Sequence, residues 1–357
     1  MQQKDETVKE SRSAAENGIK ILQKKQEQMD MNPYIGHESQ VYRIEEHRLI
    51  GGKGDGMRLL EIANGCGLEM TISPDRCADI SRLTFRGSSL SYFSPSGYVA
   101  PPYYDDTRDR WLNSFTAGFL TTCGLRGVGS SCVDEGEEVP LHGTIANIPS
   151  EHVYWFREGK ELMIRADIKD EVIFGSKLSL FREYRVRIDE NTFVIKDVIE
   201  NTGDTEQPLE ILYHMNMGYP LLDEDSVVHI PSCEVTPRDA HAAEDLANWM
   251  RMEKPQAGYV ERCYYHKFSN EKGKASIWQP KLHLGLEMAF DAKKLDGFVE
   301  WKMMGIRDYV LGLECGNCYP DGRDVMRKTG MLKFIRPGER VSYQVTVRML
   351  EENPGDA

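Results

Sequence analysis

Apolar and polar residues alternate with a period of two along much of the chain beyond residue 40. The clearest stretches are ELMIRADIKD (161–170), SKLSLFREYRVRID (176–189), TFVIKDVIEN (192–201) and PLEILYHMNMG (208–218). Successive side chains of a β-strand point to opposite faces, so this period predicts strands that each have one apolar face. Turn formers such as those in ENTGDTEQP (200–208) separate the strands, and we therefore expect antiparallel hairpins.

Strand patterns of this kind recur to the end of the chain, and no break in composition divides them. Many short strands with few helices are typical of an all-β sandwich, which often forms one domain even at this length. We therefore predict a single large antiparallel β-sandwich over residues 33–357. Residues 94–140 are rich in Gly, Ser, Pro and Asp, and we expect long loops there, where functional residues often lie.

The first part of the chain has apolar residues at helical spacing instead. One face of the expected helix carries Val8, Ala15, Ile19, Leu22 and Met29, and the other face is Lys, Glu and Gln. This pattern predicts a helical arm over residues 1–32 that lies on the body of the protein or on a second copy. The arm is therefore the candidate element for a homo-oligomer.

Acidic residues outnumber basic ones, with 57 Asp and Glu against 44 Lys and Arg and a formal net charge of −13. Binding to nucleic acids or anionic membranes needs clustered positive charge, so this balance argues against both as partners. No apolar run is long enough to span a bilayer, and the start of the chain lacks the hydrophobic stretch of a signal peptide. We therefore expect a cytoplasmic protein.

The chain contains eight cysteines, which a cytoplasmic location would keep as reduced thiols. Cys315 and Cys318 form a CxxC pair, a spacing found in redox and zinc sites. The sequence has no second pair at zinc-ribbon spacing and no thioredoxin-like βαβ pattern around this one. We expect both cysteines to be structural or incidental thiols.

Four stretches contain groups that could carry chemistry: PDRCADI (74–80), PLHGTIANIP (140–149), EILYHMNMGYP (210–220) and WKMMGIRDYVLGLECGN (301–317). Arg76 and Asp79 lie at a strand-connecting turn, where a local ion pair would be enough to explain them. His142 precedes a glycine that would let the backbone pass close to another segment. That setting suits either a packed loop histidine or a histidine that contacts a ligand.

His214 lies near the end of an alternating strand, on a face that it shares with Asn216. That face is either exposed or part of a polar binding surface. Glu314 follows the hydrophobic run YVLGL, so its carboxyl must be exposed, paired or shifted in pKa. A histidine and a carboxylate that face one another across a cleft form an acid–base pair. Together with His142 they would also suit a metal site of two histidines and one carboxylate.

Motifs for several other kinds of chemistry are missing from the sequence. It has no GxSxG elbow, no P-loop, no GxGxxG after a strand and no HExxH. Serine hydrolysis and nucleotide use are therefore unsupported.

The order of the motifs resembles that of the galactose mutarotase-like (aldose 1-epimerase) superfamily. The matching segments, which span roughly residues 40–350, are DRCADI, LHGTIAN, ILYHMNMGYPLL, VTPRD, GYVERCYYH, WKMMGIRDYVLGLE and DGRDVMRKTGMLKFIRPGERVSYQVTV. The sequence is most similar to a branch described as aldose 1-epimerase family proteins. The resemblance implies a β-supersandwich with a cleft for a small-molecule carbohydrate on the concave face of one sheet. It also implies no metal and no organic cofactor.

The resemblance also implies roles for individual residues in a mutarotase, an isomerase that interconverts the anomers of a free sugar. Glu314 would be the general base and His214 the general acid. The residues expected to bind the sugar are His142, Arg76, Glu261, Asn216, Trp301, Lys302 and Asp79. Trp301 would offer the sugar ring an apolar face. Lys302 is the candidate cation for an acidic sugar, although a regular strand would point it the opposite way from Trp301.

Two other functions fit the same residues. A carbohydrate-binding or sensor protein could retain the fold without the reaction. An isomerase or lyase could act on a modified sugar in the same cleft, with Glu314 removing a proton from carbon.

Overall fold

The computed structural model describes residues 32–353. Apart from Asn32, the helical arm predicted for residues 1–32 lies outside the described residues, and so does its part in self-association. The chain divides into two units, residues 1–41 and 42–357. The described part of the first unit contains a short 3-10 helix, η1 (Glu38–Gln40), and the second unit contains the strands.

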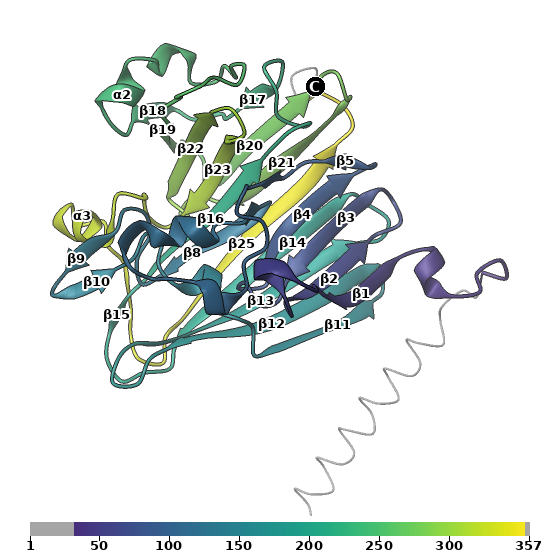
Figure 1. The fold of residues 1–357 in the computed structure, drawn as a ribbon, viewed down its shortest axis with the longest axis horizontal. Coiled ribbons are helices and arrows are strands. Elements are labelled where there is room, and N and C mark those ends of the chain that lie inside the picture. Colours follow the sequence, from purple (N-terminus) through teal and green to yellow (C-terminus); the bar gives the residue numbers. More distant parts are fainter. Residues whose placement is uncertain (1–31, 354–357) are drawn as a thin grey trace, which may run out of the picture. The chain divides into compact units, whose positions relative to one another are not determined.

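An eight-stranded antiparallel sheet forms one layer of the second unit (Figure 1). Its strands in spatial order are β11 (His152–Glu158), β12 (Glu161–Glu171), β13 (Lys177–Arg187), β14 (Thr192–Asn201), β25 (Arg340–Leu350), β21 (Leu284–Asp291), β20 (Lys272–Gln279) and β17 (Val227–His229). The predicted alternation is confirmed in β12, where Leu162, Ile164 and Ile168 are buried and Arg165 is partly exposed. One face of this sheet therefore belongs to the core.

Two smaller antiparallel sheets complete the layers. The six-stranded sheet has the order β18 (Glu234–Pro237), β19 (Arg262–Lys267), β22 (Gly297–Met304), β23 (Tyr309–Gly316), β16 (Glu210–Met217) and β8 (Leu120–Leu125). The five-stranded sheet has the order β1 (Arg43–Arg48), β2 (Arg58–Ala63), β3 (Leu68–Ser73), β4 (Asp79–Phe85) and β5 (Ser88–Ser89).

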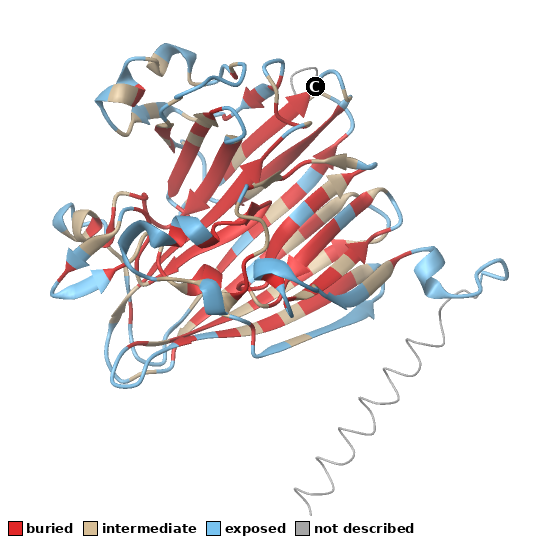
Figure 2. Cartoon of the chain, viewed as in Figure 1, coloured by how far each residue is buried: buried red, intermediate tan, exposed pale blue. Residues whose placement is uncertain are grey.

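A single apolar cluster joins the three sheets. The eight-stranded sheet contributes Ile195 and Val345, the six-stranded sheet Tyr213 and Leu313, and the five-stranded sheet Ile72. Removal of this much apolar surface from water is the main force that holds such layers together. The prediction of large antiparallel β-sheets around a shared core is confirmed, and Figure 2 shows buried residues along nearly the whole of β16 and β23.

Shorter elements connect the sheets. The two-stranded ribbons are β6 (Tyr92–Phe93) with β7 (Ala117–Gly118), β9 (Cys132–Asp134) with β10 (Glu137–Val139), and β15 (Gln207–Pro208) with β24 (Phe334–Ile335). The helices are η2 (Gly52–Gly54), η3 (Pro101–Tyr103), η4 (Arg108–Ser114), η5 (Ile145–Asn147), α2 (Ala240–Ala243), η6 (Leu246–Asn248) and α3 (Arg323–Lys328). Among residues 32–353, no helix has the length and apolar character needed to cross a membrane.

Residues 94–140 are more ordered than the predicted long loops. They include β8, all six residues of which are buried at the edge of the six-stranded sheet. A strand covered on both faces need not alternate apolar and polar residues, and the sequence LTTCGL of β8 does not. The expectation of long loops was therefore wrong for this part.

Candidate active site

His214 and Glu314 lie directly opposite one another on neighbouring strands. His214 is in β16 and Glu314 in β23, and the two residues are cross-strand partners in the antiparallel register. Partners of this kind project to the same face of a sheet. Nε2 of His214 lies 3.2 Å from Oε1 of Glu314, a hydrogen-bonding distance without the alignment of a hydrogen bond. The structure thus brings the two predicted acid–base residues together.

Both members of this pair are buried, with exposed side-chain fractions of 6% for His214 and 2% for Glu314. Burial raises the pKa of the Glu314 carboxyl well above its ordinary value, and the negative charge of Glu261 acts in the same direction. Burial lowers the pKa of His214 well below its ordinary value, and His142 adds to that effect. Each shift favours the uncharged form. The two shifts together move the shared proton toward the Glu314 carboxyl.

His142 reaches the pair from the loop between β10 and η5. Its backbone has a φ of +57°, and the next residue, Gly143, has a φ of +73°. A Cβ on Gly143 would overlap the carbonyl oxygen of Gly124 in β8, which confirms the expectation of a close backbone approach. The His142 ring packs edge-on against that of His214, with centroids 5.6 Å apart. Burial lowers the pKa of His142 to about 4, so its imidazole is neutral near pH 7.

Three aromatic rings surround the two histidines. Trp301 of β22 lies edge-on to His214 at 5.3 Å between centroids, and Phe115 lies 5.6 Å from the same ring. Trp111 of η4 lies 4.8 Å from the His142 ring and stacks on Phe115. Trp301 was predicted from the sequence, whereas Trp111 and Phe115 were not, because both lie in the segment that was expected to form loops. Aromatic residues within such a polar segment were the available signal.

Glu261 and Arg238 form a charged pair beside Trp301. An Nη of Arg238 lies 2.9 Å from Oε1 of Glu261, and the indole nitrogen of Trp301 donates to Oε2 of Glu261 at 2.7 Å. The charge of Glu261 raises the pKa values of Glu314 and His142, whereas that of Arg238 lowers both. The two charges thus shift the pKa values of Glu314 and His142 in opposite directions. Arg238 was not singled out from the sequence.

Several buried polar atoms at this face have no hydrogen-bond partner among the described residues. They are Nε1 of Trp111, Nδ1 of His142, Nδ1 of His214, Oδ1 of Asn216 and Oε1 of Glu314. Buried polar atoms are normally satisfied in native proteins, and a cluster of exceptions needs an explanation. These atoms need partners from outside the described residues, such as water or a polar ligand.

A comparison with family models decides where the chain belongs. Residues 54–349, well over half of the chain, match the model of DUF4432, a domain of unknown function. The chain belongs to the DUF4432 family. No curated protein sequence matches it.

Several solved structures similar to this DUF4432 protein are named as aldose 1-epimerases or galactose mutarotase-like proteins. One is a Klebsiella pneumoniae protein provisionally named an aldose 1-epimerase, with 25% identity, a TM-score of 0.82, and coverage of 88% of this chain and 86% of that chain. A galactose mutarotase-like protein from Clostridium acetobutylicum has 14% identity and a TM-score of 0.61, over 87% and 99% of the two chains. A galactose 1-epimerase from Lactobacillus acidophilus has 12% identity and a TM-score of 0.58, over 87% and 100%. The resemblance inferred from the sequence motifs is confirmed.

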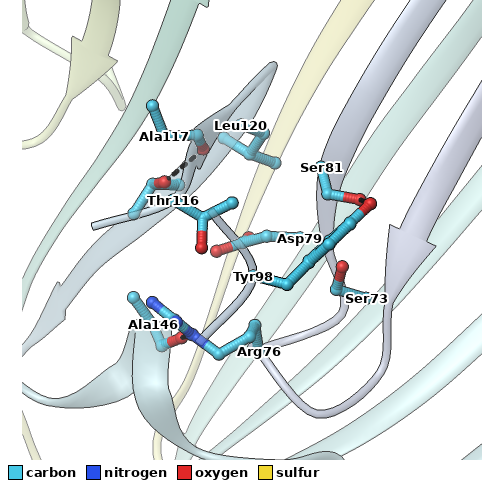
Figure 3. A pocket seen from close by; sticks show the side chains of 10 residues that line it. Ser73, Arg76, Asp79, Ser81, Tyr98, Thr116, Ala117, Leu120 and Ala146 are labelled. Atoms are coloured by element: carbon cyan, nitrogen blue, oxygen red, sulfur yellow. Dashed lines mark hydrogen bonds between the residues drawn. The ribbon is translucent and has the colours of Figure 1, made fainter. Parts of the chain in front are cut away.

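Arg76 of the DUF4432 protein lines a small cavity, which Figure 3 shows together with Asp79. Thr121, the cross-strand partner of His214, also lines this cavity. Nε of Arg76 donates to the carbonyl of Ala146 at 2.7 Å, and an Nη donates to that of Val99 at 2.9 Å. Burial lowers its pKa to about 10. Ala146 belongs to η5, directly after the loop of His142, so Arg76 holds that loop. Among residues 32–353, no hydrogen bond or ion pair joins Arg76 to Glu314.

Asp79 belongs to a buried network on the other side of the same cavity. Its carboxylate accepts hydrogen bonds from the backbone nitrogen and hydroxyl of Thr122 and from Arg182, at 2.6–2.8 Å. Arg182 also pairs with Asp197 at 2.7 Å. Both oxygens of Asp79 are therefore engaged by protein groups. The structure gives Asp79 a place in the core of the DUF4432 domain and does not bring it to the histidine pair.

Lys302 and Asn216 have different positions relative to the pair. Lys302 points away from the face of Trp301 and donates to the carbonyl of Arg251 at 2.7 Å, as the strand alternation required. The structure therefore does not bring Lys302 to the candidate site as the cation for an acidic sugar. Asn216 shares the face of His214 and donates to its backbone carbonyl at 3.0 Å.

The two cysteines of the CxxC pair are free and buried, as are several others of the eight free thiols. Burial raises the pKa of both Cys315 and Cys318 above the ordinary thiol value. Both thiols are therefore protonated and unreactive near neutral pH. Among the described residues, no group of three or more His, Cys, Asp or Glu is arranged to hold a metal ion.

Proposed function

We propose that this protein interconverts the anomers of a free sugar or sugar derivative, as an aldose 1-epimerase does. The observation that carries the proposal is the buried His214–Glu314 pair, whose Nε2 and Oε1 lie 3.2 Å apart among unpartnered polar atoms. The reaction needs one group that gives a proton and one that takes a proton. The likeness to proteins named as aldose 1-epimerases supports the same conclusion. We expect this chemistry in the cytoplasm, on a small carbohydrate.

In the proposed mechanism Glu314 takes the proton of the anomeric hydroxyl while His214 gives a proton to the ring oxygen. The bond between C1 and the ring oxygen breaks, and the sugar opens to its aldehyde. After rotation about the C1–C2 bond, the ring closes on the other face and both proton transfers reverse. No proton is gained or lost over the cycle.

The pair must begin this cycle with its proton on His214. Burial in the ligand-free site favours the other arrangement, a protonated Glu314 and a neutral His214. The two arrangements hold the same number of protons and differ by one transfer across the 3.2 Å contact. Hydroxyl groups of a bound sugar would hydrogen-bond to the charged pair and stabilise it.

The remaining residues of the site would bind and orient the sugar. His142 is neutral near pH 7 and offers an unpartnered Nδ1, and Trp111 offers an unpartnered indole nitrogen. Trp301 lies beside His214 and is held by Glu261, so its ring can cover an apolar face of the sugar. Arg76 is proposed to act through the His142 loop. Precise orientation of reacting groups of this kind accounts for a large share of catalysis.

The test is an anomer-exchange measurement by NMR on D-glucose, D-galactose and D-glucuronate. The wild type should exchange the anomers of at least one sugar faster than buffer, and the rate should survive EDTA. Glu314→Gln and His214→Ala should each lose about 10²–10⁴-fold in rate. Glu234→Gln, a control at an exposed carboxylate of β18, should match the wild type.

Each alternative function has its own outcome in this test. A carbohydrate-binding protein would bind a sugar of the panel without faster exchange. An isomerase or lyase would place solvent deuterium on a sugar carbon. A metal enzyme would lose its activity with EDTA. Any of these results, or full activity of Glu314→Gln, would refute simple anomerisation.

A further inference from the structure

Gly312 lies on the same face of β23 as Glu314, two residues before it. Its cross-strand partners are Asn216 of β16 and Trp301 of β22, so it occupies the floor of the candidate site. A glycine in the middle of a strand weakens the strand and calls for a reason. The backbone does not supply one, because Gly312 is an ordinary strand residue and lies outside the set of glycines with positive φ.

A glycine is needed at position 312 because the Glu314 carboxyl occupies the space that a side chain would fill. A Cβ on Gly312 would overlap Oε1 of Glu314 and would lie 3.1 Å from Cβ and 3.2 Å from Cε3 of Trp301. The carboxyl of Glu314 therefore folds back along its own strand and rests over Gly312, against Trp301. The oxygen in that space is the one that lies 3.2 Å from Nε2 of His214.

We propose that Gly312 is a positioning residue for the acid–base pair, because only a position without a side chain lets the Glu314 carboxyl reach His214. A methyl group there would push the carboxyl away from the imidazole. The carboxyl is nearly fully buried and Trp301 closes one side of its space, so it cannot move aside and keep the contact. This inference rests on the proposed function of the same site and names a residue that acts through Glu314.

The experiment compares Gly312→Ala, Glu314→Gln and the double variant on the sugar that the wild type exchanges fastest in the panel. Gly312→Ala should lower kcat by about 10²-fold with little change in KM, as expected for a misplaced reacting group. In the Glu314→Gln background the same change should have no further effect on kcat. Gly305→Ala is the matched control, because the atoms nearest to its Cβ would be the side-chain end of Met303 and the carbonyl oxygen and Cβ of Asp308.

A stability measurement tests the same contact without any activity. Gly312→Ala should lower the Tm in the wild type, and the loss should shrink in a Glu314→Ala background, where the overlapping carboxyl is gone. If Gly312→Ala does not fold alone, the double variant with Glu314→Ala should still fold. A purely structural role for Gly312 would give the same Tm loss in both backgrounds.

The results separate the two proposals. Three outcomes would each overturn the role of Gly312. The first is a wild-type kcat in Gly312→Ala, and the second is an equal loss of kcat in the wild-type and Glu314→Gln backgrounds. The third is a loss of Tm that Glu314→Ala does not relieve. Full activity of Glu314→Gln would instead overturn the proposed function. In that case the Tm comparison still decides whether Gly312 makes room for the carboxyl.

Discussion

Nε2 of His214 lies 3.2 Å from Oε1 of Glu314, across the cross-strand pair that joins β16 to β23. Two titratable groups at this distance share their protons, so their titration belongs to the pair and not to either residue alone. Burial raises the pKa of Glu314 and lowers that of His214, so both shifts favour the uncharged forms. The shared proton of the pair is therefore shifted toward the Glu314 carboxyl.

The first prediction is a bell-shaped pH dependence of kcat/KM for anomer exchange. Activity should fall at low pH, in a range below the ordinary histidine pKa, because the pair then takes up a second proton at His214. It should fall at high pH as the pair loses its only proton, in a range above the ordinary glutamate pKa. Rates measured from acid to alkaline pH check both limbs. An alkaline limb at or below the ordinary glutamate pKa would contradict the raised pKa of Glu314.

The second prediction is that the charges of Glu261 and Arg238, beside Trp301, shift the alkaline limb in opposite directions. Glu261 raises the pKa of Glu314, so Glu261→Gln should move the alkaline limb to lower pH. Arg238 lowers that pKa, so Arg238→Gln should move the limb to higher pH. A glutamine at position 261 can still accept from the Trp301 indole, which limits the change to charge. Limbs that move in the same direction would mean that the two charges do not act on Glu314.

The third prediction concerns stability. A carboxyl whose folded pKa is raised stabilises the fold below its unfolded pKa, and that contribution is lost as pH rises through the folded pKa. Glu314→Gln cannot lose a proton, so it should unfold at a higher temperature than the wild type at alkaline pH. The difference should disappear near the ordinary glutamate pKa. Thermal unfolding across this range checks the prediction, with Glu234→Gln as the exposed control. A less stable variant at alkaline pH would be the contrary result.

The fourth prediction is that Asp79 stabilises the fold and has no part in sugar binding. Asp79→Ala leaves Arg182 with one of its two carboxylate partners, in a fully buried position. Loss of a partner from a buried ion pair costs about 3–5 kcal/mol of unfolding free energy. Urea unfolding should show that loss, and kcat and KM of the folded fraction should stay at wild-type values. The control Asp75→Ala removes a more exposed partner of Arg58 and should cost less. A raised KM in Asp79→Ala would restore its predicted role in sugar binding.

Some features of the site could be read from the sequence because they depend on neighbours along the chain. The alternation in β12 and β16 predicted strands, since successive side chains of a strand point to opposite faces of the sheet. The same rule predicted that Lys302 points away from Trp301, and the structure shows it bonded on the other face. The glycine after His142 predicted a close approach of backbone, which Gly124 provides.

Other features depend on which strands become neighbours, and no local pattern encodes that choice. β8 was missed because a strand buried on both faces need not alternate. Trp111, Phe115 and Arg238 were missed because their packing against the site comes from distant segments. Arg76 and Asp79 were placed with the sugar by resemblance, and their partners in the fold are Ala146, Val99, Thr122 and Arg182.

The sequence by itself determined that the chain forms antiparallel strands, that His214 and Glu314 lie on two of them, and that their motifs follow the order of a mutarotase-like family. Only the tertiary structure decided that these two strands are neighbours and in a register that makes the residues partners. A slip of one residue in that register would turn Glu314 to the opposite face of the sheet. The register is fixed by core packing over the whole layer, and the acid–base pair exists because of it.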